Sequence, residues 1–221
     1  MAHIDFIENI HKSTQRDYIG ERVLGVNKAE CAKISKQFGK DYWDGDRKYG
    51  YGGYVYDGRW RDVAEKIVQH YGIKAGDRIL DIGCGKGFML YEFTQVIPGI
   101  KVIGLDVSQY GLDNAKEEVK PYLQLGNATK ITFEDNSFDL VLSINVLHNL
   151  MNYDLHIALQ EIERVSKKNK YIVNDSYRTE KEKVNLMYWQ LTCEVFYTPK
   201  EWEWFYQQSG YNGDYSFIFY E

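Results

Sequence analysis

The stretch Ile79-Leu80-Asp81-Ile82-Gly83-Cys84-Gly85-Lys86-Gly87-Phe88 (ILDIGCGKGF) places three glycines within five positions, directly after a short apolar run. The apolar run predicts a buried strand over 78–82, and FMLYEFTQVI (88–97) predicts a helix that ends before a Pro-Gly pair. A glycine-rich turn between a strand and a helix lets the backbone approach a ligand, because no Cβ stands in the way. The stretch therefore predicts a ligand site at the end of this strand.

Strands and helices alternate from about residue 60 to residue 176. The expected strands cover 78–82, 101–107, 121–126, 138–145 and 170–176, and the expected helices cover 61–71, 88–97, 109–119 and 153–166. This alternation is typical of an α/β fold, a doubly wound, mostly parallel sheet with helices on both faces. Ligands of such sheets bind beyond the carboxyl ends of the strands. The loops after residues 82, 106, 126 and 144 are therefore expected to form the site.

Size and charge narrow the class of protein. With 221 residues and 44% hydrophobic content, one domain over 1–221 is expected, with an N-terminal section (1–60), a core (61–176) and a C-terminal section (177–221). A net charge of -5 argues against general binding of nucleic acid or anionic membranes. The first 20 residues lack the layout of a signal peptide, and no apolar run is long enough to span a membrane, so we expect a cytoplasmic protein. Three widely spaced cysteines predict reduced thiols and no metal site.

The spacing of the glycines separates two kinds of nucleotide site. A dinucleotide site favours Gly-x-Gly-x-x-Gly, whereas the sequence has Gly-x-Gly-x-Gly after an acidic residue within the strand. LDIGCGKG resembles the first motif of class I S-adenosylmethionine-dependent methyltransferases. The resemblance implies that the turn holds the methionine part of that cofactor, whose product is S-adenosylhomocysteine. The matching residues are Asp81, Gly83, Cys84, Gly85 and Gly87, with Cys84 expected to pack rather than to react.

Three further elements follow in the order of that family. Asp106, with Val107, ends the second expected strand, where a carboxylate accepts hydrogen bonds from ribose hydroxyls. Dehydrogenases place an acidic residue in the same way, so Asp106 alone does not separate the two classes. Asn127 and Ala128 stand where the family meets adenine, although Asp is commoner there than Asn. FEDNSFDLVLSINVLHNL (133–150) resembles the fourth motif and assigns Asn145 to the cofactor.

Transfer of a methyl group to a hydroxyl needs a base, whereas an anionic acceptor needs none. His148 follows the fourth expected strand, and an imidazole of ordinary pKa suits proton removal at neutral pH. His148 is therefore the candidate base, with Tyr51 and Tyr177 as further catalytic candidates and Asn149 and Arg178 as acceptor-binding residues. The alternatives are a non-catalytic His148 at the cofactor wall and a solvated loop at NDSYR (174–178).

The segment before the first expected core helix, DYWDGDRKYGYGGYVYDGRW (41–60), is rich in tyrosine and glycine. Amphipathic rings on a bendable backbone are typical of a lid over a site. Its arginines suit a phosphate or carboxylate group, and the residues assigned to acceptor binding are Arg47, Tyr54, Tyr56 and Arg59. The alternative is an ordered wrap, in which the aspartates of the segment balance its cations.

The C-terminal section predicts an inserted helix over TEKEKVNLMYWQLTCEVFYT (179–198), a helix that starts at Pro199, and one terminal strand. The family normally ends with two strands, so the sheet edge and the choice between monomer and homodimer stay open. The leading hypothesis is O-methylation of a small polar or anionic acceptor, sugar-linked or phosphorylated, as in small bacterial enzymes of capsule modification. The alternatives are an N- or C-methyltransferase of a small metabolite and a cofactor-binding subunit without catalysis.

Overall fold

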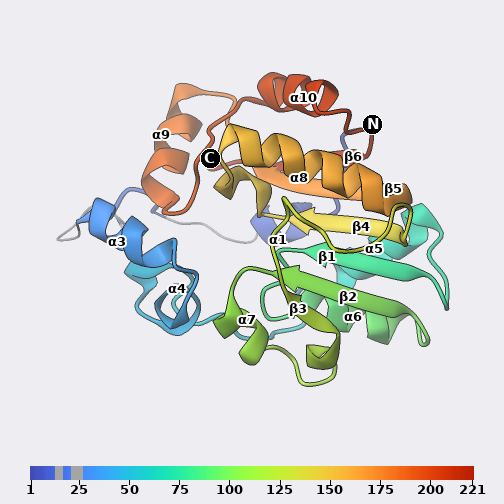
Figure 1. Ribbon diagram of the computed structural model, residues 1–221. Helices are drawn as coiled ribbons and strands as arrows, with labels where there is room; N and C mark the ends of the chain where they lie inside the picture. Colours follow the sequence, from blue (N-terminus) through green and yellow to red (C-terminus); the bar gives the residue numbers. More distant parts are fainter. Residues whose placement is uncertain (13–16, 21–26) are drawn as a thin grey trace.

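Figure 1 shows the computed structural model, which describes residues 1–12, 17–20 and 27–221. The described residues form a sheet of six strands in the order β3-β2-β1-β4-β5-β6, and every neighbouring pair is parallel. The strands are β1 (Arg78–Ile82), β2 (Lys101–Asp106), β3 (Leu123–Leu125), β4 (Phe138–Ile144), β5 (Ser166–Asp175) and β6 (Asp214–Ile218). The expected α/β fold with a doubly wound, mostly parallel sheet is confirmed.

Helices cover both faces of the sheet (Figure 1). Alternate residues of a strand point to opposite faces, so the buried side chains fall into two apolar clusters. One cluster joins the sheet to α5 (Arg61–Tyr71), α6 (Phe88–Val96) and α9 (Glu180–Trp189). The other joins it to α8 (Asn152–Val165) and α10 (Pro199–Gln208). Because both faces are buried, the strands read as continuous apolar runs.

The register of the strands brings three turns together at one end of the sheet. Ile82 pairs with Leu105, and Asp106 pairs with Leu125. The strands β1, β2 and β4 all point toward the side where α4 (Lys40–Asp44), α7 (Gln109–Asp113) and α9 lie (Figure 1). The turns that follow β1, β2 and β4 therefore meet beneath the N-terminal and C-terminal sections of the chain.

The N-terminal section is built from short pieces. Its described elements are α1 (Glu8–Lys12), α3 (Lys28–Ser35), α4 and the 3-10 helix η1 (Arg47–Tyr49). Asn27 caps α3, since its side-chain oxygen accepts hydrogen bonds from two backbone N–H groups of the first turn. Helix α3 ends at Ser35, and Phe38 shortly after it adopts a φ of 49°.

The N-terminus also covers one edge of the sheet. His3 forms a parallel bridge with Tyr215 of β6, and the N–H of Ile4 donates to the carbonyl of Tyr215 at 2.9 Å. The expected single terminal strand is confirmed as β6, which lies directly beside β5. The first residues of the chain thus shield an edge strand whose backbone would otherwise be open to pairing.

Two expected elements between β2 and β4 are shorter than predicted. The helix after Ser108 ends at Asp113 instead of about Val119, because the chain turns to let the N–H of Lys116 donate to the carbonyl of Lys86 at 3.0 Å. The strand expected over 121–126 is reduced to Leu123–Leu125, since Pro121 lies in the 3-10 helix η2 (Lys120–Tyr122). In contrast, β5 starts earlier than expected, at Ser166.

Over residues 1–12, 17–20 and 27–221, no helix has the length and apolar run that crossing a bilayer requires.

We predict that Ile7→Ala lowers the free energy of unfolding by about 2–4 kcal/mol, because Ile7 is fully buried in the cluster that contains α5 and α6. Denaturant titration followed by circular dichroism measures this change. Ile19→Ala is the control, since Ile19 is 40% exposed and its truncation should cost under about 0.5 kcal/mol. An equally small effect of Ile7→Ala would contradict docking of the N-terminus on the core.

Candidate active site

A cavity of about 560 Å³ opens at the carboxyl ends of the strands. Its floor is formed by the turns after β1, β2, β3 and β4, and its other walls come from the segment 38–60 and from the C-terminal section. A cavity of this volume suits a ligand of nucleoside size together with a second small molecule. The sequence-predicted residues in its wall are Arg47, Tyr51, Tyr54, Arg59, Asp81, Gly83, Cys84, Gly85, Asp106, Val107, Asn127, Ala128, Asn145 and Asn149.

The carboxylate of Asp106 joins the turns after β1 and β2. One oxygen accepts a hydrogen bond from the N–H of Gly85 at 2.7 Å, and the other accepts one from the N–H of Ser108 at 2.7 Å. The two bonds fix the carboxylate at the end of β2, where it lines the cavity. Each carboxylate oxygen keeps a second lone pair, so Asp106 can accept a pair of hydroxyl donors from a ligand.

Asp81 is the next-to-last residue of strand β1 and is almost fully buried. Burial raises the pKa of this carboxyl to about 7, and the nearby charge of Asp106 adds to the effect. A positive group close to such a carboxyl favours its ionised form. Asp81 is therefore placed to hold a cationic group of a ligand at the cavity floor.

Two glycines of the turn after β1 stand at positions that have no room for a side chain. A Cβ on Gly83 would lie 2.2 Å from the side chain of Val146, and a Cβ on Gly85 would lie 2.6 Å from the ring of Trp43. Both glycines have a positive φ, of 81° and 54°. The turn is thus closed to any other residue by conformation and by contact.

The adenine side predicted from the sequence lies on the same cavity wall. The amide oxygen of Asn127 caps its own loop by accepting from the N–H of Thr129 at 2.9 Å, which leaves the amide nitrogen as its ligand-binding group. Ala128 is buried beside it. Cys84 is also buried, and burial raises the pKa of its thiol well above the usual value, so Cys84 is a packing residue.

Two amide oxygens in the cavity wall are buried without a hydrogen-bond partner among the described residues, those of Asn145 and Asn149. Asn145 also has a φ of 62°, a conformation that asparagine tolerates better than most residues. An unpaired buried acceptor costs free energy unless a ligand supplies a donor. Both side chains belong to the cavity wall, and an N–H or O–H group of a ligand that reached either oxygen would satisfy it.

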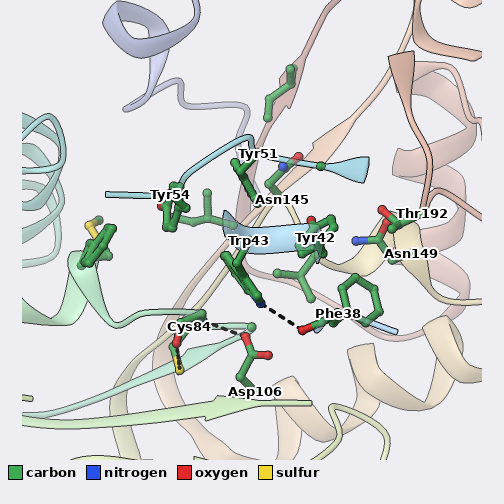
Figure 2. Close-up of a pocket in the computed structure, with 18 of the residues that line it drawn as sticks. Phe38, Tyr42, Trp43, Tyr51, Tyr54, Cys84, Asp106, Asn145, Asn149 and Thr192 are labelled. Atoms are coloured by element: carbon green, nitrogen blue, oxygen red, sulfur yellow. Dashed lines mark hydrogen bonds between the residues drawn. The ribbon is translucent and has the colours of Figure 1, made fainter. Parts of the chain in front are cut away.

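The N-terminal section lies directly over the glycine-rich turn. Figure 2 shows Trp43 between Tyr51 and the loop of Cys84, with Asp106 below. The ring of Trp43 stacks on Tyr51 at 5.3 Å between centroids, and its Nε1 donates to Ser108 at 2.8 Å. Lys86 of the turn is buried and bonds both carboxylate oxygens of Asp44 at 2.7 Å. This ion pair ties the section to the cavity floor.

The arginines that were expected to bind an acidic acceptor are engaged within the section itself. Arg47 donates to the carbonyls of Gly50 at 3.1 Å and Tyr51 at 2.6 Å. Arg59 donates to both carboxylate oxygens of Asp57, at 2.7 and 3.0 Å from its Nε. Both arginines line the cavity, but the bonds leave them poorly suited to grip a phosphate.

His148, the expected base, is fully buried and lies behind the cavity wall that the described residues form. The 3-10 helix η3 (Leu147–Asn149) turns its side chain inward, while Asn149 faces the cavity. The ring contacts Asp175 at 3.4 Å, and burial lowers the pKa of the imidazole. Direct proton removal from an acceptor in the cavity by His148 does not fit this position.

Four other predicted residues lie outside that wall. Tyr56 donates to Glu92 at 2.5 Å, and the ring of Tyr177 lies under the ammonium of Lys183. Arg178 pairs with Glu182 and with Glu221. Gly87 is the N-cap residue of α6 and is not among the residues of the cavity wall.

Several wall residues were not assigned from the sequence. They are Phe38, Tyr42, Trp43, Trp60, Gln190, Thr192 and Tyr220. Figure 2 shows Tyr42 and Phe38 facing Asn149 and Thr192, which come from distant parts of the chain. The aromatic content of residues 38–60 was the available signal for the wall residues of that segment, whereas no pattern in the sequence marked Tyr220.

We predict that Lys86→Met loosens the N-terminal section, because the carboxylate of Asp44, which also accepts from the N–H of Tyr54 at 3.1 Å, loses its anchor. Hydrogen exchange at Tyr54 should become about tenfold faster or more, as expected for the loss of a largely buried ion pair. Lys48→Met is the control, since its exposed pair with Asp46 should contribute little. Unchanged exchange at Tyr54 in Lys86→Met would show that the pair does not hold the section.

Comparison with known proteins identifies the domain. Residues 80–174 match the family described as "Methyltransferase domain". A demethylmenaquinone methyltransferase from Symbiobacterium thermophilum is 37% identical over 118 residues, which cover 50% of this chain and 46% of that protein. A ubiquinone biosynthesis O-methyltransferase from Rickettsia bellii is 28% identical over 160 residues, 71% of this chain and 65% of that protein. The chain thus spans less than two thirds of the length of either relative.

Solved structures agree in fold. A chain of the Haloferax volcanii complex between the Trm112 methyltransferase activator and a methyltransferase has a TM-score of 0.55 at 22% identity, and covers 70% of this chain and 73% of that one. The Haemonchus contortus phosphoethanolamine N-methyltransferase 2, solved with S-adenosylhomocysteine, has a TM-score of 0.53 at 20% identity, with 85% and 45% covered. In sequence the segment 80–174 is therefore similar to methyltransferase domains, and the described residues share the fold of these solved structures.

Proposed function

We propose that this chain transfers a methyl group from S-adenosylmethionine to a small, uncharged acceptor with a flat ring. The observation that carries the proposal is the composition of the cavity wall. The wall includes Asp81 and Asp106, and two amide oxygens without a hydrogen-bond partner among the described residues. Its two arginines bond groups of this chain, and aromatic rings form much of the rest. This wall suits a cationic nucleoside beside a neutral aromatic partner.

The residues present fit S-adenosylmethionine. Asp106 would accept hydrogen bonds from the ribose hydroxyls, as its carboxylate is already oriented by two backbone N–H groups. Asp81 would hold the amino group, and Asn127 and Ala128 would border the adenine. When bound, the cofactor supplies an activated methyl group on a sulfonium. The residues of this chain then have to orient the acceptor and exclude water, and Trp43, Tyr51 and Tyr54 are placed to do so.

The engaged arginines weigh against an anionic acceptor. A phosphorylated or phosphoramidate-bearing acceptor would have to share Arg59 with the carboxylate of Asp57, or Arg47 with two backbone carbonyls. A neutral hydroxyl of a sugar-linked acceptor avoids this cost, so a role in surface-polysaccharide synthesis stays a prediction. The relatives reported above bear names from quinone synthesis, which supports a ring-shaped acceptor over a sugar.

The raised pKa of Asp81 predicts how cofactor binding depends on pH. Below about pH 7 the carboxyl is protonated, so the affinity for the cationic cofactor should fall roughly tenfold between pH 8 and pH 6. Calorimetric titration measures this dependence. Asp81→Asn should bind weakly at both pH values, with no such slope. A wild-type affinity that is independent of pH would contradict the role of Asp81.

The same shift has a consequence for the unliganded protein. The pKa is raised above its unfolded value, so the favourable contribution of Asp81 to stability is complete below about pH 4 and is lost as pH rises through about 7. Asp81→Asn should therefore be more stable than wild type at pH 8, and the difference should shrink toward pH 4. Thermal unfolding at several pH values provides this check without any ligand.

Label transfer from S-adenosylmethionine to a panel of acceptors tests the proposed function. The panel contains a hydroquinone, a neutral sugar, a phosphorylated sugar and a primary amine. We expect label on the hydroquinone, less or none on the phosphorylated sugar, and uptake of the cofactor by calorimetry. Label only on the phosphorylated sugar or on the amine would overturn the proposed acceptor. Binding of NAD in place of S-adenosylhomocysteine would overturn the proposed cofactor.

A further inference from the structure

A buried carboxylate lies outside the cavity and next to two residues of its wall. Asp175 ends β5 and is fully buried, with its carboxylate between His148 on one side and Gln190 and Tyr220 on the other. One carboxylate oxygen, Oδ1, has no hydrogen-bond partner among the described residues. Gln190 and Tyr220 both line the cavity. A charged group of this kind, half satisfied and linked to the wall, is costly for a purely structural role.

His148 fixes the orientation of this carboxylate. Its Nδ1 accepts a hydrogen bond from the backbone N–H of Asp175 at 3.3 Å, which leaves the ring hydrogen on Nε2. Nε2 faces Oδ2 of Asp175 at 3.4 Å. The backbone of His148 is held in turn, since its N–H donates to Asn174 at 3.2 Å. His148 therefore positions Asp175 and does not face the cavity itself.

Tyr220 links the carboxylate to the cavity. Its hydroxyl lies beside the carboxylate of Asp175, because Nε2 of Gln190 donates to both groups. Of the two, only the hydroxyl has a hydrogen to give to an ionised carboxylate. The same oxygen accepts from Nε2 of Gln190 at 3.0 Å. The backbone carbonyl of Tyr220 is held by Asn185 at 2.9 Å. One lone pair of the phenol oxygen is left for a donor in the cavity.

We propose that Tyr220 accepts the proton of a hydroxyl group on an aromatic acceptor and passes its own proton to Asp175, with His148 as a positioning residue. This inference rests on the proposed function, and it specifies oxygen as the methylated atom. As the acceptor oxygen bonds to the methyl carbon, the methyl–sulfur bond breaks and its electron pair stays on sulfur. The hydroxyl proton moves to Tyr220, and the Tyr220 proton moves to the carboxylate. The proton returns to solvent along the same path after the products leave.

The surroundings favour this relay over a static hydrogen bond. Burial raises the pKa of the Asp175 carboxyl, which makes its ionised form a stronger proton acceptor than an exposed carboxylate. The rings of Phe219, Trp189 and Tyr18 also line this side of the cavity. A flat ring that stacks there would bring a ring-bound hydroxyl, the most acidic kind of uncharged hydroxyl, toward Tyr220.

The test uses para-nitrophenol, whose absorption separates the phenol from the phenolate. The probe is titrated into the intact protein with S-adenosylhomocysteine bound, and its spectrum is recorded against pH. We expect the apparent pKa of the bound probe to fall by at least one unit, a tenfold rise in the ratio of phenolate to phenol. Tyr220→Phe and Asp175→Asn should abolish this shift. In both variants, kcat for methyl transfer to a hydroquinone should fall by a larger factor than KM changes.

Two controls separate the relay from loss of structure. Tyr206→Phe removes another buried tyrosine hydroxyl next to β5, which accepts from Asn174 at 3.0 Å away from the cavity, and it should keep the full spectral shift. His148→Gln keeps an N–H donor and should retain most of the shift, whereas His148→Leu should lose it. Circular dichroism confirms that each variant is folded before titration.

The outcomes distinguish this inference from the proposed function. An equal spectral shift in wild type and Tyr220→Phe would overturn the relay, and so would a wild type that binds the probe without ionising it. Failure of the probe to bind while S-adenosylhomocysteine binds would overturn the aromatic hydroxyl acceptor and leave the cofactor assignment in place. Failure of S-adenosylhomocysteine itself to bind would overturn the proposed function.

Discussion

The carboxylate of Asp106 holds the site together. It bonds the N–H of Gly85 in the first turn and the N–H of Ser108 in the second, both at 2.7 Å. These bonds are possible because β1 and β2 pair in parallel, with Ile82 opposite Leu105. The turn after β1 is thereby fixed in the conformation that only glycine tolerates at Gly83 and Gly85. This carboxylate therefore helps to fix the turn on which the ring of Trp43 lies.

The second constraint is the contact of the N-terminal section with that floor. The Lys86–Asp44 pair and the Trp43–Ser108 hydrogen bond connect residues far apart in the sequence to the first and second turns. The aromatic rings of the section then form a wall opposite the C-terminal residues around Tyr220. A cavity built in this way excludes water from the reacting groups without a dedicated domain. The arginines of the wall bond groups of this chain, so the proposed acceptor would be recognised by ring stacking and by a few hydrogen bonds.

The sequence predicted the parts of the site that depend on local rules. The Gly-x-Gly-x-Gly turn and the carboxylate at the end of β2 are set by strand order and backbone conformation, and they lie where they were expected. The prediction that His148 acts as a direct base does not fit its position, because neighbouring residues of a short helix face different directions. In η3, Asn149 faces the cavity and His148 faces the core, and no local pattern signals which of the two does so. For Arg47 and Arg59 the sequence left two interpretations open. Arg59 follows the one in which an aspartate of the segment balances it, and Arg47 bonds backbone carbonyls that no sequence pattern signals. Tyr220 could not be found, because its role depends on contacts with Asp175 and Gln190 that only the assembled sheet creates.

The central claim is that Asp106 receives the ribose of an adenosyl cofactor, and calorimetric titration of S-adenosylhomocysteine into wild type and Asp106→Asn tests it most directly. The account predicts clear binding to wild type and an affinity at least about tenfold lower for Asp106→Asn, because the change weakens charge-assisted hydrogen bonds to the ribose. Circular dichroism should show that the variant keeps its fold. Equal affinities in the two proteins, or no heat of binding in wild type, would contradict the claim.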